Sequence, residues 1–163
     1  MTLDGLDTLD THILSELQRN ARRVSSRDIA ETVSETPSTI RKRIQRLEDA
    51  GVISAYRADI DYERAGYQVY FQIVCTAPIP ERATMAEKGL SVSGVVSVRE
   101  LATGQRNVVF TVAGEDTDDL TRIAATLSEI GLTILDEELI RRDHAGAFFS
   151  STEREQSNDK QND

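Results

Sequence analysis

The spacing of apolar residues changes near residue 61, and this change divides the chain into two parts. Before it, apolar residues such as Leu9, Ile13 and Leu17 recur at steps of three and four, as on one face of an amphipathic helix. From Tyr67 onward they alternate instead, as in a β-strand. A chain of 163 residues has room for two small domains but not for a large catalytic core. We therefore predict an α+β protein in which a helical domain precedes a domain with a sheet.

The apolar spacing in the first part predicts three short helices, near residues 6–20, 25–34 and 37–50. Serine caps precede the second helix, and Pro37 occupies the first position of the third, where proline is favoured. Gly51 follows the third helix, as is common at a helix end. Two short helices joined by a tight turn, the second of them basic, form a helix-turn-helix.

Apolar residues alternate after the third helix, at Val52, Ile53, Tyr56 and Ile60, so we expect a small wing or a linker strand there. We place the domain boundaries accordingly. The expected parts are a winged helix-turn-helix over 1–60, a linker over 61–66, a ferredoxin-like domain over 67–145 and a disordered acidic tail over 146–163. The end of the tail, 150–163, has no apolar residue with which to offset its ordering entropy.

The second part has the element order βαββαβ. The expected strands and helices are 67–76, 81–90 (helix), 95–102, 108–113, 116–131 (helix) and 132–142. This order is typical of the ferredoxin-like fold, in which both helices cover one face of an antiparallel sheet. The other face is left without a cover, so we expect a homodimer or larger homo-oligomer.

The third helix carries the residues that we assign to DNA. If Ile40, Ile44 and Leu47 face the core, then at about 100° per residue the opposite side faces outward. We assign Ser38, Arg41, Lys42 and Gln45 to base-edge contact, and Thr39, Arg43 and Arg46 to phosphate contact or intramolecular pairing. The alternative is a solvated face with internal ion pairs to Glu48 or Asp49.

Four arginines near the first two helices are further candidates for phosphate contact, although they could equally be surface charge. They are Arg19, Arg22, Arg23 and Arg27.

The net charge of −9 is unusual for a DNA-binding protein, but it is unevenly distributed. Residues 1–60 hold 9 basic and 10 acidic side chains, whereas residues 61–163 hold 10 and 18. Only 3 of the 19 basic residues are lysines. This pattern suggests a halophilic source with a high-salt cytoplasm.

We expect a soluble cytoplasmic protein, because the chain has neither a signal segment nor an apolar run long enough to cross a membrane. Cys75 lies in an apolar alternation and is expected to be buried and inert. His12 and His144 have no partners at metal-ligand spacing, and neither a phosphate loop nor a nucleophile motif is present. We therefore expect no metal, no cofactor and no enzymatic activity.

Three stretches resemble the Lrp/AsnC family, the leucine-responsive or feast/famine regulators. They are residues 6–14 (LDTLDTHIL), 36–44 (TPSTIRKRI) and 46–53 (RLEDAGVI). The resemblance implies a winged helix-turn-helix joined to a ferredoxin-like regulatory domain, dimers that pair through their sheets, often higher multiples of dimers, and sensing of an amino acid or related metabolite.

The chain departs from the family at two places. Ser34-Glu35 replaces a Gly-Leu pair before the third helix, and Asn107 replaces an acid in the hairpin Gly104, Gln105, Arg106, Asn107. We consider this hairpin a candidate effector loop, with turn shaping as the alternative. The loss of an acid there disfavours an effector with an ammonium group.

The expected function is that of a sequence-specific transcriptional regulator that binds double-stranded DNA as a dimer or higher oligomer and responds to an amino acid or other small metabolite. Two alternatives stay open. One is a sirohaem (tetrapyrrole) decarboxylase-like enzyme with the same fold, and the other is an architectural DNA-packing protein.

Overall fold

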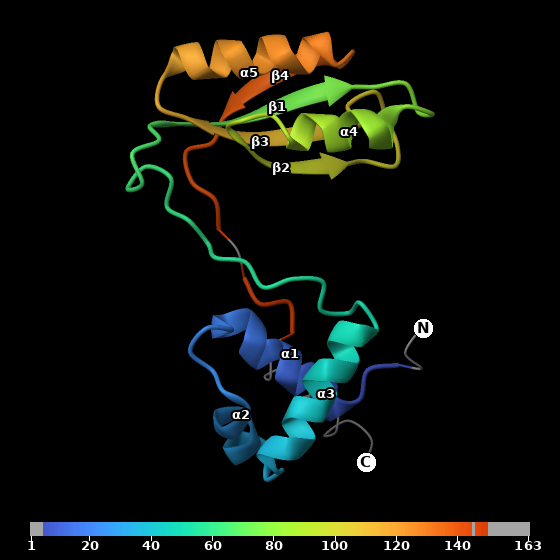
Figure 1. Ribbon diagram of the computed structural model, residues 1–163, viewed down its shortest axis with the longest axis vertical. Helices are drawn as coiled ribbons and strands as arrows, with labels where there is room; N and C mark the ends of the chain where they lie inside the picture. The colour runs from blue at the N-terminus through green and yellow to red at the C-terminus, as the bar shows by residue number, and fades with distance from the viewer. Residues whose placement is uncertain (1–4, 145, 150–163) are drawn as a thin grey trace, which may run out of the picture. The chain divides into compact units, whose positions relative to one another are not determined.

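The computed structural model of the chain describes residues 5–144 and 146–149, which form two compact units (Figure 1). One unit is Asp59–Asp143, and the other contains the described residues before it together with those after it. The chain therefore passes from the first unit into the second and back again. None of the helices in the described part of the chain is long and apolar enough to cross a membrane.

The first unit contains the three predicted helices, α1 (Thr8–Asn20), α2 (Ser26–Val33) and α3 (Pro37–Asp49). Each begins at a polar cap whose side chain accepts a hydrogen bond from the backbone N–H three residues later. The caps are Asp7, Ser25 and Thr36. These bonds satisfy backbone donors that a helix start would otherwise leave open.

The core of the first unit joins all three helices. Its buried apolar side chains are Ile13, Leu14, Ile29, Ala30, Ile40 and Leu47. Phe149, from the far end of the chain, is partly buried against this cluster. Its backbone N–H donates to Oε1 of Gln18 on α1 over 3.1 Å.

Residues 146–149 therefore differ from the predicted disordered tail, because the aromatic side chain of Phe149 finds apolar surface to cover. The remainder of the predicted tail, 150–163, lies outside the described residues.

The turn between α2 and α3 contains the only non-glycine residue of the described chain with a positive φ. Ser34, the C-cap of α2, has φ 56° and ψ 38°, and its N–H donates to the carbonyl of Ala30. This left-handed conformation is strained for a residue with a Cβ. Ser34 is the position at which this chain has serine in place of the glycine of the Gly-Leu pair named above.

The wing or linker strand predicted at Val52–Ile60 is wrong as a strand, since the chain forms no strand between α3 and residue 69. A strand needs a hydrogen-bonded neighbour, and the described residues provide none for this segment. Val52, Tyr56 and Ile60 are instead exposed.

The second unit has the predicted order of elements. They are β1 (Val69–Thr76), α4 (Arg82–Leu90), β2 (Val95–Glu100), β3 (Val108–Gly114), α5 (Thr117–Glu129) and β4 (Thr133–Leu139). The sheet order is β2-β3-β1-β4, and every pair of neighbours is antiparallel. This is the ferredoxin-like arrangement predicted from the sequence.

Both helices of this unit pack on one face of the sheet. The core combines alternate residues of the strands, such as Ile73 and Phe110, with Ala86 of α4 and Leu127 of α5. Gly89 of α4 is required for this packing, because a Cβ there would lie 2.5 Å from the ring of Phe110.

Cys75 is buried in the same core, as predicted. Burial, with a smaller effect of the Glu137 charge, raises the pKa of its thiol to about 11. The thiol therefore stays protonated near neutral pH.

Candidate nucleic-acid interface

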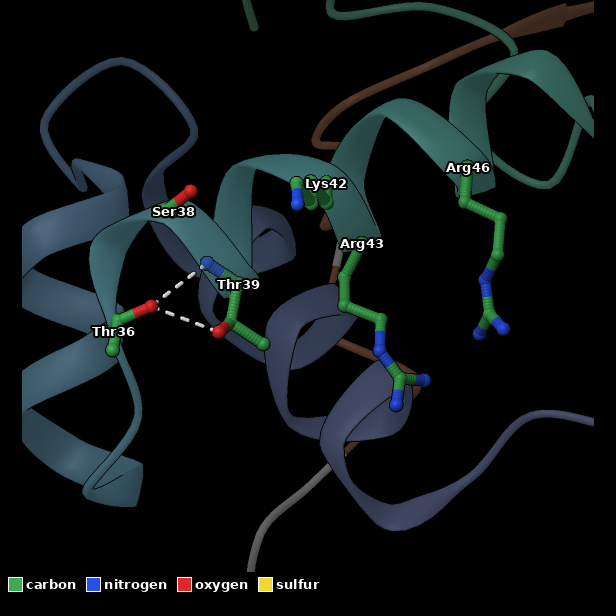
Figure 2. A pocket seen from close by; sticks show the side chains of 6 residues that line it. All are labelled: Thr36, Ser38, Thr39, Lys42, Arg43 and Arg46. Carbon is green, nitrogen blue, oxygen red and sulfur yellow. Dashed lines mark hydrogen bonds between the residues drawn. The ribbon is translucent and has the colours of Figure 1, made fainter.

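One side of α3, together with its cap, lines a shallow hollow on the surface of the first unit (Figure 2). Its lining is polar or cationic throughout and consists of Thr36, Ser38, Thr39, Lys42, Arg43 and Arg46. Five of these six are residues that the sequence assigned to DNA; Thr36 is the helix cap, with hydrogen bonds to the N–H and hydroxyl of Thr39.

The side of α3 that faces away from the core carries Ser38, Lys42 and Gln45, with Arg41 on one flank of this side, and all four residues are exposed. Within residues 5–144 and 146–149, the side chains of Ser38, Arg41 and Lys42 have no hydrogen-bond or ion-pair partner. Their donors are thus available to a ligand. Gln45 differs, because its amide donates to Oδ1 of Asp49 over 2.9 Å.

Arg43 and Arg46 leave α3 on the side that Thr39 shares (Figure 2). Both are bound to acidic side chains at the start of α1. Nη1 of Arg43 donates to Oδ2 of Asp7 over 2.5 Å and to Oδ1 of Asp10 over 3.2 Å. Nη2 of Arg46 donates to the other oxygen of Asp10 over 2.5 Å. The sequence left phosphate contact and intramolecular pairing open for Arg43 and Arg46. In the free chain, both arginines are paired within the molecule.

The electrostatics of this cluster follow from its contacts. The backbone N–H of Asp10 and the Arg43 guanidinium lower the pKa of Asp7, against a smaller opposing effect of burial. The Asp7 carboxylate, in turn, raises the pKa of Arg43. The Asp10 side chain has no exposed surface, whereas those of Arg43 and Arg46 are 29% and 44% exposed.

The sequence did not assign a role to Asp7 or Asp10. Their spacing marks a capping box at the start of α1, which the structure contains. The pairing with arginines more than 30 positions later has no local sequence pattern. Only the packing of α1 against α3 brings these side chains together.

The four arginines around α1 and α2 lie on the surface. Arg19 pairs with Glu16 over 3.1 Å and Arg27 with Glu31 over 3.2 Å, each within its own helix. Arg22 and Arg23 are exposed in the turn that follows α1. Their assignment to phosphate stays a prediction.

The histidine of α1 forms a contact between helices. Nε2 of His12 lies 2.8 Å from the hydroxyl oxygen of Thr32 on α2. Because that hydroxyl donates to the carbonyl of Ile29, it accepts from His12. No group of three or more metal-binding side chains occurs in the described part of the chain.

The candidate effector loop lies in the second unit between β2 and β3. Gly104, Gln105 and Arg106 are exposed, and Arg106 pairs with Asp136 of β4 over 2.7 Å. Asn107 is buried, and its amide forms hydrogen bonds to both the N–H and the carbonyl of Ala77. The last residue of the loop therefore joins β3 to the end of β1.

Comparisons with known proteins agree with this arrangement. Residues 6–54 match the family model described as winged helix-turn-helix DNA-binding. The HTH-type transcriptional regulator PH0140 of Pyrococcus horikoshii is 31% identical over 117 residues, which are 72% of this chain and 73% of that protein. The leucine-responsive regulatory protein of Haemophilus influenzae is 43% identical over 59 residues, 36% of this chain and 35% of that protein.

Solved structures extend the likeness to both units. The crystal structure of MtbAldR is 27% identical, covers 86% of this chain and 97% of its own, and has a TM-score of 0.70. LrpC of B. subtilis shares the fold, with a TM-score of 0.72 at 17% identity over 86% of this chain and 98% of its own. The L-Met complex of the transcriptional regulator NMB0573 from Neisseria meningitidis has a TM-score of 0.71 at 22% identity, over 90% of this chain and 96% of its own. With its helix-turn-helix and ferredoxin-like unit, the chain belongs to the Lrp/AsnC family of DNA-binding transcriptional regulators.

Proposed function

We propose that this regulator recognises its DNA sites through the outward face of α3, with Ser38, Arg41, Lys42 and Gln45 directed at base edges in the major groove. The proposal rests on the side chains of Ser38, Arg41 and Lys42. They are exposed, they are polar or cationic, and none has a hydrogen-bond or ion-pair partner in the described part of the chain. Arginine and lysine commonly donate to guanine, and serine can bond to several bases.

The regulator acts as a dimer or higher oligomer. One copy of α3 covers a single half-site, and helix-turn-helix proteins pair two recognition helices about one helical turn of DNA apart. The sheet supports this proposal, since no helix of its own unit, Asp59–Asp143, covers the face opposite α4 and α5. Sedimentation at several protein concentrations tests it, and a monomer at every concentration would contradict it.

The interface is tested by comparing K42Q with K88Q. Both substitutions remove one lysine charge, but Lys88 lies on α4 in the second unit, so it serves as a matched control. A binding site is first selected from genomic DNA with the unmodified protein. We expect K42Q to weaken binding to that site by about ten-fold or more, the loss of one good base contact, and K88Q to leave it unchanged.

Equal losses in K42Q and K88Q would show that α3 is not the interface. Equal affinity of the unmodified protein for the selected site and for random DNA would instead identify an architectural DNA-packing protein. Sequence-specific regulators commonly bind their own sites about 10³-fold or more tightly than random DNA.

We further propose that a small metabolite with a carboxylate modulates this regulator at the loop Gly104–Asn107. The NMB0573 structure contains L-Met, which makes an amino acid a reasonable ligand class for the shared fold. In this chain the charge of the loop comes from Arg106, whose exposed guanidinium also pairs with Asp136. Because a cation attracts a carboxylate and the loop has no acid of its own to bind an ammonium group, the ligand would be held through its carboxylate, and acidic or neutral amino acids are better candidates than basic ones.

The effector proposal is tested by the shift in melting temperature with each amino acid, for the unmodified protein and for R106Q. A stabilising ligand whose effect disappears in R106Q supports the loop. R99Q, in the neighbouring strand β2, is the control for loss of an exposed arginine. No stabilisation by any amino acid, or equal stabilisation of R106Q, would contradict the proposal.

A further inference from the structure

We propose that Asp10 is a positioning residue for DNA recognition, because it holds Arg43 and Arg46 on the α1 side of the recognition helix and withdraws both from phosphate contact. The inference rests on the proposed function of α3. It adds that the cations of this helix fall into two classes, of which only one faces DNA.

The first step concerns the position of Asp10. It is the third residue of α1, and its side chain has no exposed surface. It takes part in the capping box, since its backbone N–H donates to Asp7 over 2.8 Å and its Oδ2 accepts from the N–H of Asp7 over 3.3 Å. The carboxylate is therefore fixed by its own helix before any contact with α3.

The second step concerns the charge. A buried carboxylate is costly unless cations and hydrogen bonds compensate for it. In the described structure this compensation comes from α3, with Arg43 on one carboxylate oxygen and Arg46 on the other. Movement of either arginine toward a phosphate would leave the buried charge of Asp10 short of a partner. The intramolecular state is favoured for this reason.

The third step is geometric. At about 100° per residue, positions 39, 43 and 46 lie on one flank of α3, beside the outward side that carries positions 38, 42 and 45. Two arginines bound to α1 on that flank fix the rotation of α3 about its own axis. Asp10 thereby determines which side chains of α3 point outward.

The consequence for binding can be measured through salt. Each phosphate that a protein cation neutralises adds about 0.9 to the slope of log K against log salt concentration. Arginines that already pair with Asp7 and Asp10 contribute little to this slope. Released arginines would add to it, and they would add equally on every DNA sequence, so the preference for specific sites would fall.

The decisive experiment compares D10N with D28N on a short duplex of random sequence, over a range of KCl concentrations. Both variants lose one negative charge at the third residue of a helix that begins with a capping box, but the Asp28 side chain bonds to Ser25 and forms no hydrogen bond or ion pair with α3 in the described part of the chain. We expect D10N to bind random DNA more tightly and to steepen the slope by about 1 to 2. We expect D28N to match the unmodified protein.

A second variant decides the matter if D10N does not fold, as judged by circular dichroism. R46Q keeps Asp10 and its contact with Arg43, and removes only the second arginine. On random DNA we expect its salt slope to equal that of the unmodified protein. A decrease by about 0.9 would show that Arg46 contacts phosphate and would overturn the proposal, as would an unchanged slope in a folded D10N.

These outcomes separate this proposal from the proposed function. If K42Q also leaves binding to the selected site unchanged, then α3 itself is not the interface. If K42Q weakens binding while R46Q lowers the slope, α3 is the interface and only the role of Asp10 is wrong.

Discussion

The buried side chain of Asn107 is bound to the backbone of a single residue, Ala77. It accepts a hydrogen bond from the Ala77 N–H over 2.9 Å and donates one to the Ala77 carbonyl over 2.8 Å. The amide has both an acceptor and a donor, whereas an ionised carboxylate has no donor. We therefore expect N107D to lower the free energy of unfolding by about 2 kcal/mol at pH 7, the cost of an unsatisfied buried carbonyl.

The N107D effect should depend on pH. A protonated carboxyl can donate to the Ala77 carbonyl, so the pKa of the new side chain is raised in the folded state. Its stabilising bond is present below the unfolded pKa of about 4 and is lost as pH rises through the folded value. Urea denaturation at pH 4 and pH 7 measures this, and an equal deficit at both would contradict it.

Ser34 offers a substitution that should stabilise the first unit. Its left-handed backbone at φ 56° is unfavourable for serine and free for glycine. We expect S34G to raise the free energy of unfolding by about 1 kcal/mol. The control is S26G, which places glycine in a helical position of α2 and should destabilise. The idea fails if both variants change stability in the same direction.

Asp7 should contribute stability that is lost in acid. Its pKa is lowered in the folded protein, first by the backbone N–H of Asp10 and then by Arg43. A lowered pKa gives stability that is present above the unfolded value near 4 and is lost as pH falls through the folded value. D7N keeps a good helix cap and removes only the charge.

We therefore expect D7N to be less stable than the unmodified protein at pH 7 and nearly equal to it at pH 2.5. Because the Asp7 side chain is 51% exposed, solvent screening keeps the difference at pH 7 below about 1 kcal/mol. Melting temperatures at the two pH values provide the test. A gap that does not narrow in acid would rule out the ion pair as its source.

Cys75 should react with thiol reagents only after the protein opens. Its pKa of about 11 leaves very little thiolate at pH 8, and the side chain is fully buried. In urea the exposed thiol returns to an ordinary pKa of about 8.5 and reacts as a thiolate. Ellman's reagent should therefore give a slow reaction in native buffer and a fast one in urea. Immediate reaction in native buffer would contradict the buried position.

Molar KCl should stabilise the protein. Residues 61–163 carry 18 acidic side chains against 10 basic ones, so repulsion within this part opposes the compact state. At 1 M salt the Debye length is about 3 Å, which screens this repulsion. We expect the melting temperature to rise from dilute buffer to molar KCl. An unchanged or lower value would count against a halophilic source.

Local patterns predicted the elements of this chain well. The serine cap before α2, Pro37 at the start of α3, the steps of three and four in α1 and the alternation in β1 all come from forces between residues close in sequence, and the structure contains each of these elements. The predicted strand at 52–60 was wrong because it rested on a local pattern alone. Alternation shows that a segment could pair, but pairing depends on a partner strand.

The contacts of the candidate site were less predictable. The outward face of α3 follows from the positions of Ile40 and Leu47, both of which are buried. The partners of Arg43 and Arg46 do not follow from any spacing, since Asp10 lies on another helix. Arg43, Arg46 and Lys42 are all basic residues of α3 and look alike in the sequence. In the structure, the two arginines are paired with acidic side chains of the first helix, whereas Lys42 faces outward.

The place of Phe149 has a consequence for the order in which this protein can be completed. The three helices of the DNA-binding unit are synthesised first, yet part of the surface that covers their core belongs to residue 149. While the ribosome is still translating the sheet, the apolar surface beside Gln18 has no such cover. Of the two units, the helical one is therefore translated first but completed last. A recombinant fragment that stops at residue 58 would lack the contact with Phe149.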